Sequence, residues 1–166
     1  MNFETIPDED DGADAAATTT DAIELLTADH EDVMMLFADY EELVSDSASA
    51  EERRHLVRQI CSALNAHTTA EEDIFYPAAR AAIGQPALLD QAEAEHSSAK
   101  ALIAQLLRMD PADAQYDATV VQLQDAIEQH VHEEGANSSP SFRTATSICK
   151  RLASGSPIGW MRCWPS

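Results

Sequence analysis

The chain has 166 residues, of which 45% are hydrophobic and 24% are charged, and this composition is typical of one globular domain. Asp and Glu total 30 and Lys and Arg total 10, so the formal net charge is −20. This charge argues against nucleic acid or an anionic membrane surface as a partner, because both require a positively charged protein face.

The sequence has no run of about 18 apolar residues, so we expect no membrane span. The N-terminus lacks the basic start and apolar core of a signal peptide. Cys61, Cys149 and Cys163 have no metal-binding or redox spacing. We therefore expect a cytoplasmic protein.

Glycine is scarce and aromatic residues are only 5%, which favours helices.

Residues 1–20 are acidic and rich in small side chains, and we expect them to form a disordered lead-in. A helical bundle over residues 21–135 is expected to follow, with its first helix at 21–45. The second helix should begin after Ser49, because Ser49 and Glu52 three residues later form the pattern of a capping box.

The second helix is expected to end near Ala82, before the sequence GQP breaks the chain. A third helix begins at Pro86, which suits a first helical position. Asp110 followed by Pro111 repeats this start signal and predicts a fourth helix, for which Gly135 is a natural stop. Four helices with short connections predict an all-α, antiparallel up-down four-helix bundle.

Apolar residues recur at steps of three or four along each predicted helix and define one inward face per helix. Each face includes one histidine, and on two faces a glutamate follows one turn later. We expect His55 and His132, which fall off these faces, to be exposed. The predicted inward residues are Ile23, Leu26, His30, Val33, Phe37, Tyr40 and Val44; Leu56, Ile60, Ala63, His67, Glu71, Ile74 and Ala78; Leu89, Ala92, His96, Ala99, Ile103 and Leu106; and Tyr116, Val120, Leu123, Ile127, His130 and Glu134.

The inward histidines and glutamates together predict a buried metal site. A single histidine on an apolar face is more often a hydrogen-bonded core residue. Buried carboxylates without partners are costly, however, and a central cation would satisfy all of these groups at once. The alternative is a metal-free core in which waters and mutual hydrogen bonds satisfy them. The predicted ligands are His30, His67, Glu71, His96, His130 and Glu134.

Imidazole and carboxylate ligands without thiolate suit Fe, Mn, Zn or Cu. The predicted set exceeds the four ligands of tetrahedral zinc and suits two octahedral ions bridged by carboxylates. Such ligands supply about eight of about twelve metal bonds. The remaining positions are expected to hold water, hydroxide or oxo bridges, or an exogenous molecule such as O₂.

The motifs around these residues resemble those of the hemerythrin family, specifically the bacterial hemerythrin-like HHE cation-binding domains. The matching stretches are DHEDVMMLF around His30, HTTAEEDIFYP with His67 and Glu71, AEHSSAKAL around His96, and HVHEE with His130 and Glu134. The resemblance implies a non-haem di-iron centre that binds or reacts with O₂. By position, the histidines would be terminal ligands and the two glutamates would bridge the irons.

One departure from the family pattern affects the expected function. Oxygen-carrying hemerythrins have a second histidine four residues after the third helix's histidine, and here Lys100 takes that position. The resemblance therefore favours oxygen or redox sensing, iron handling, or defence against nitric oxide and peroxide. Glu72 and Glu133 could substitute for a ligand or support one, or simply face solvent.

Three other hypotheses remain open from the sequence. The first is a ferroxidase- or peroxidase-like enzyme at the same site, although a metal- and O₂-binding protein is favoured. The second is a metal-free structural bundle. The third is a ferritin-like protein, which ranks lower because that group uses Glu-x-x-His rather than His-x-x-x-Glu. The sequence names no protein partner.

Residues 136–166 differ sharply from the rest of the chain, since they have no Asp or Glu but include both Trp residues. After Glu134 the small, polar GANSS replaces the apolar EDIFY that follows Glu71. If the codons from Ala136 onward are read in a frame that starts two bases later, suitable codon choices can encode a charged, amphipathic continuation of the fourth helix. We therefore expect an irregular tail that is hypothesised to arise from a frame shift, and sequencing the DNA tests this. A chain with the restored frame should be more stable and retain iron better.

Overall fold

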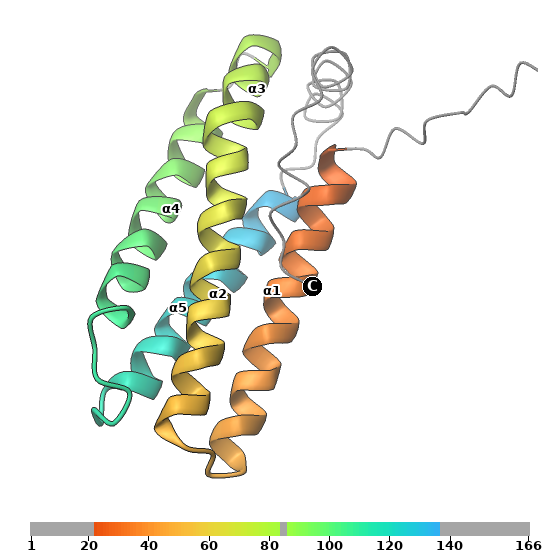
Figure 1. Ribbon diagram of the computed structural model, residues 1–166. Helices are drawn as coiled ribbons and strands as arrows, with labels where there is room; N and C mark the ends of the chain where they lie inside the picture. Colours follow the sequence, from red (N-terminus) through yellow and green to blue (C-terminus); the bar gives the residue numbers. More distant parts are fainter. Residues whose placement is uncertain (1–21, 84–85, 137–166) are drawn as a thin grey trace, which may run out of the picture.

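A computed structural model describes residues 22–83 and 86–136 (Figure 1). These ranges form a bundle of helical arms that run alternately up and down, so the predicted all-α fold is confirmed. The second arm consists of α2, a short π-helical segment η1 and α3, which follow one another without a break. The elements are α1 (Ala22–Ser45), α2 (Ala50–Ala70), η1 (Glu71–Phe75), α3 (Tyr76–Ile83), α4 (Pro86–Leu106) and α5 (Tyr116–Ala136).

The turn between α1 and α2 is fixed by local hydrogen bonds on both sides. At the end of α1, Ala48 N–H donates to Leu43 O and Ser47 adopts a positive φ of 56°, as in a Schellman ending. At the start of α2, the Ser49 side chain accepts from Glu52 N–H while Glu52 accepts from Ser49 N–H. The predicted capping box is therefore present, and it explains why α2 begins at Ala50.

The predicted start of the last helix was wrong. Asp110 Oδ1 accepts from Ala112 N–H and Asp113 Oδ1 accepts from Gln115 N–H, so both aspartates form turns. Because of these turns, α5 begins only at Tyr116. At its other end, α5 continues through Gly135, which lacks the positive φ of a helix-ending glycine.

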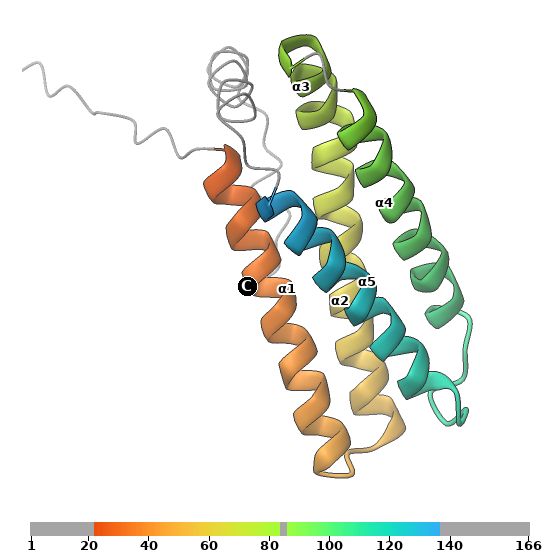
Figure 2. The same ribbon diagram turned by 180° about the vertical axis from the view of Figure 1, so that it is seen from behind.

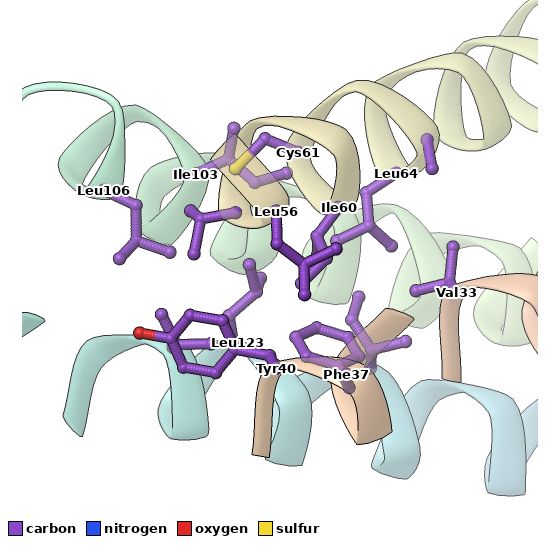
Figure 3. Packing of buried hydrophobic residues seen from close by; sticks show 14 of the residues in the cluster. Val33, Phe37, Tyr40, Leu56, Ile60, Cys61, Leu64, Ile103, Leu106 and Leu123 are labelled. Carbon is purple, nitrogen blue, oxygen red and sulfur yellow. The ribbon is translucent and has the colours of Figure 1, made fainter. Parts of the chain in front are cut away.

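The main hydrophobic core lies in the half of the bundle next to the α1–α2 turn, where α1, α2, α4 and α5 all contribute (Figure 3). Its buried residues include Phe37, Ile60, Ile103 and Leu123, each from a different helix. A second, smaller cluster beyond the histidines includes Phe75 and Leu89. The histidines thus lie between two apolar regions of the same bundle. The predicted inward faces hold here, except that Val44 near the end of α1 is 40% exposed.

The π-helical segment changes which residues of the second arm face inward. The periodicity predicted an inward Ile74, but Ile74 is 46% exposed, whereas Phe75 and Tyr76 are buried. A π turn takes up one more residue than an α turn, so every later side chain is rotated relative to the α-helical pattern. The predictions for Ile23 and Ala78 concern side chains outside the described set.

The expected disordered lead-in lies outside the described residues, as does the anomalous tail apart from Ala136. Within the described ranges, no helix combines the length and the apolar character needed to cross a bilayer.

Candidate metal centre

One histidine from each of four helices lies in a single buried layer across the bundle. The ring centroids of His30 and His67 are 4.4 Å apart, those of His96 and His130 are 4.6 Å apart, and those of His30 and His130 are 5.9 Å apart. All four rings are buried. His55 and His132 are exposed, as their positions off the inward faces predicted.

Both predicted glutamates reach this layer. Glu71 is fully buried, and its Oε2 lies 3.3 Å from His67 Nε2, 3.1 Å from His96 Nε2 and 4.0 Å from His130 Nε2. Glu134 places Oε2 3.7 Å from His30 Nε2 and Oε1 3.7 Å from His130 Nε2. The fold therefore brings together all the predicted site residues. We call them the histidine–carboxylate cluster: His30, His67, Glu71, His96, His130 and Glu134.

Carboxylates outside the cluster contact the opposite nitrogen of three histidine rings. Asp29 Oδ2 lies 3.5 Å from His67 Nδ1 and Glu95 Oε2 lies 2.8 Å from His130 Nδ1. Glu72 Oε1 lies 3.1 Å from His96 Nδ1. Such contacts fix the orientation of a ring and leave its Nε2 directed at the centre, as in many metal sites.

Sequence reasoning considered Glu72 but missed Asp29 and Glu95. Each of these two residues directly precedes an inward histidine, yet each contacts a histidine on a different helix. An acidic residue directly before an inward histidine was the available signal, but the sequence did not show which histidine that residue contacts. Glu133, the other residue considered, instead accepts hydrogen bonds from Gln91 and Gln129.

Sequence reasoning also missed Tyr76, which is 1% exposed and has its hydroxyl beside the cluster. The Tyr76 oxygen lies 3.3 Å from Glu71 Oε2, 3.4 Å from Glu134 Oε1 and 3.4 Å from His96 Nε2. Regular α-helical periodicity places Tyr76 away from Glu71. Its position depends on the π-helical segment between them, which no pattern in the sequence revealed.

Burial and crowding perturb the acid–base properties of the cluster. Burial, with the nearby Glu71 carboxylate, raises the pKa of Glu134 to about 8. Burial would raise the pKa of Glu71 too, but the adjacent His67 and His96 imidazoles outweigh it and hold that pKa well below its usual range. Two carboxylates this close do not both ionise readily without a positive charge between them.

The histidines are affected in opposite directions. Burial, together with the neighbouring His67, lowers the pKa of His30 to about 4. Burial would also lower the pKa of His67, but the carboxylates of Asp29 and Glu71 outweigh it and raise that pKa to about 9. Without a cation, the cluster therefore carries protons on some groups that a metal would need deprotonated.

The unsatisfied atoms of the cluster fit a cation. Among the described residues, His30 Nε2, both ring nitrogens of His67 and Glu71 Oε1 are buried and make no hydrogen bond. Buried polar atoms normally have partners, so this concentration of exceptions calls for a ligand. Ligand atoms of His30, His67, Glu71 and His130 lie within 4.8 Å of one another, and imidazole and carboxylate are suitable metal donors.

A cavity of about 540 Å³ adjoins the cluster between α1, η1 and α5. His30, Glu71 and Glu134 line its inner side, and Met34, Phe75 and Val131 form part of its apolar wall. In Figure 2, the end of α5 (blue) lies beside the upper part of α1 (orange). The cavity gives small molecules a route to the cluster on the His30 side.

Comparisons with known proteins identify the family and the fold. The family model of the Hemerythrin HHE cation binding domain matches residues 21–136. A crystal structure of a hemerythrin HHE cation-binding domain-containing protein from Mycobacterium kansasii is similar in fold, with a TM-score of 0.60. That likeness has 23% sequence identity and covers 87% of this chain and 93% of the other. No curated protein matches the sequence. The chain belongs to the hemerythrin HHE cation-binding domain family, and its histidine–carboxylate cluster is its candidate cation site.

Proposed function

We propose that this chain is a cytoplasmic protein that holds a pair of non-haem iron ions and takes part in O₂ or oxidant chemistry. The observation that carries the proposal is a buried set of unsatisfied imidazole and carboxylate atoms beside an apolar cavity. In this proposal His30, His67, His96 and His130 are terminal ligands. Glu71 and Glu134 bridge the two ions.

The division of the cluster into two halves supports a pair of ions rather than one. His30 and His67 form one close pair of rings, and His96 and His130 form the other. Glu134 directs one oxygen toward His30 and the other toward His130. A carboxylate with an oxygen in each half is suited to bridging two cations.

The donor types and the cavity support iron and a small oxidant. The cluster has no thiolate. His96 and Glu134 lie beside the four residues whose ligand atoms are within 4.8 Å of one another, so the side chains available outnumber the four donors of tetrahedral zinc. The largely apolar cavity suits O₂ and other small neutral molecules, which would reach the cluster beside His30. When bound, a redox-active pair would supply the electrons for reaction with such a molecule. Sensing, iron handling, and defence against nitric oxide or peroxide are all consistent with this chemistry.

Metal analysis combined with optical spectroscopy tests the proposal. The protein is expressed with iron supplied, and its metal content and spectrum are measured before and after exposure to O₂. We expect two irons per chain and new near-ultraviolet charge-transfer absorption after exposure. A colourless zinc protein would overturn the redox function, and a folded chain that takes up no metal would favour the metal-free structural bundle.

A ferroxidase- or peroxidase-like enzyme at the same site is a second candidate. The observation that favours it is the cavity, because about 540 Å³ is within the usual range for sites that bind small organic ligands. Oxidation of Fe(II), or consumption of peroxide with a reductant, far beyond two equivalents per chain would support the enzyme. Reaction that stops at the iron content of the site would support a sensor or buffer.

A further inference from the structure

The hydroxyl of Tyr76 lies in the histidine–carboxylate cluster because of the π-helical segment. In an α-helix, residues five apart are rotated by about 140° from one another, at about 100° per residue. Here Tyr76 N–H donates to Glu71 O, which closes a π turn and stacks the two residues on the same face. π-Helical segments of this kind are frequent at functional sites.

The distances around the Tyr76 hydroxyl suit a shared cation better than a hydrogen bond. Good O–H···O bonds are about 2.7–2.8 Å long, whereas the hydroxyl lies 3.3–3.4 Å from Glu71 Oε2, Glu134 Oε1 and His96 Nε2. Donors around a six-coordinate ion with bonds of about 2.0–2.2 Å are about 3 Å apart along an octahedral edge. The 3.1 Å between His96 Nε2 and Glu71 Oε2 and the 3.2 Å between His96 Nε2 and His130 Nε2 match this spacing.

The Tyr76 ring is held on the His96 side of the cluster. It stacks on His96 with a centroid separation of 5.6 Å and an angle of 22°. Lys100, one turn after His96, does not add a donor there, because its Nζ pairs with Glu72 Oε2 at 2.6 Å. Helix α4 thus contributes one donor, while the α2–η1–α3 arm contributes His67, Glu71 and Tyr76.

We propose that the Tyr76 phenolic oxygen is a metal ligand, bound to the cation between His96 and His130. This inference rests on the proposed pair of ions. That cation then has five protein donors, with Glu71 and Glu134 completing the set, and the phenol proton is released to solvent as the oxygen binds. The cation between His30 and His67 has four donors, and it is the one that faces the cavity. Tyr76 therefore directs small ligands to the His30 side by filling a position on the other ion.

The optical spectrum of the air-oxidised, iron-loaded chain tests this assignment. A phenolate bound to Fe(III) adds a charge-transfer band in the visible, and tyrosine is a known protein ligand of iron. We expect this band in the unsubstituted protein and its loss in Tyr76→Phe, with iron still present at two per chain. Tyr116→Phe is the matched control, because Tyr116 is also 1% exposed but lies at the far end of α5. It should keep the band.

Resonance Raman spectra of the unsubstituted protein make the test independent of whether the variant folds. Excitation in the visible band should enhance tyrosinate ring vibrations. Two irons per chain without such a band, or a band that survives in Tyr76→Phe, would overturn the Tyr76 assignment and leave the proposed iron pair standing. A chain that binds no iron would overturn both.

Discussion

The two halves of the bundle use the same helices but treat buried polar groups differently. In the half next to the α1–α2 turn the core is apolar, and its buried Tyr40 hydroxyl donates to Asp117 Oδ1 at 2.6 Å. In the other half, four buried atoms of the histidine–carboxylate cluster make no hydrogen bond among the described residues. In the first half the protein itself supplies the hydrogen-bond partners of the buried polar groups. In the second half these groups require a ligand that the protein does not supply. The fold and the cation site should therefore be separable by mutation.

The largest effect is expected from removing the centre of the cluster. In His67→Leu/Glu71→Leu we expect the iron content to fall from two per chain to none, because a terminal ligand and a bridge are both lost. The chain should still fold, since replacing both members of a buried polar pair with apolar groups is often neutral. Metal analysis and circular dichroism provide the two measurements.

The matched control for this variant is His55→Leu/Gln59→Leu. It changes a histidine and the residue four positions later on the exposed side of the same helix α2. We expect it to retain both irons. Iron bound equally by both variants would contradict the proposed ligand set.

A core substitution in the apolar half should have the reverse effect. Leu123 is completely buried in the main core, and Leu123→Ala should lower the free energy of unfolding by about 2–5 kcal/mol. Metal content should remain at two per folded chain, because Leu123 lies outside the cluster. Denaturant unfolding of the metal-free protein measures the loss. A variant that lost its iron while remaining folded would show that the halves are not independent.

A smaller effect is expected from the carboxylates that contact the histidine rings from outside. Glu95→Ala removes the 2.8 Å contact to His130 Nδ1, and loss of such a contact typically lowers metal affinity about 10–100-fold. Competition with a chelator measures the affinity. Glu93→Ala on the same helix is the control, since Glu93 pairs with Arg80 rather than with the cluster. Equal affinities in the two variants would remove Glu95 from the site.

The smallest effect is a dependence of metal binding on pH. In the metal-free protein the pKa of Glu134 is raised to about 8 and that of His67 to about 9. At pH 7 both groups carry a proton that must leave when a cation binds, so affinity should rise with pH up to about 9. Calorimetric titration with Zn²⁺ in buffers of different ionisation enthalpy counts the protons released, and we expect about three: one each from Glu134, His67 and the Tyr76 hydroxyl. Binding that releases none would contradict these protonation states.

Much of the fold followed from sequence periodicity. Steps of three and four placed His30, His96 and His130 on buried faces, and the capping box at Ser49 set the start of α2. The start of α5 was predicted wrongly from Asp110, because an aspartate side chain can accept a backbone hydrogen bond either at the start of a helix or in a turn. In this structure Asp110 and Asp113 form turns, and α5 begins only after them.

The sequence by itself determined that the chain forms a helical bundle with a histidine on each inward face and a glutamate one turn later on two of them. Those features depend on helical periodicity and local hydrogen bonds, which act over a few residues. Only the tertiary structure decided that Asp29 and Glu95 support histidines of other helices, and that Tyr76 reaches the cluster. The contacts of Asp29 and Glu95 depend on packing between segments that are distant in the sequence. The position of Tyr76 depends on a π turn, which rotates every later residue of its arm and leaves no signature in an α-helical pattern.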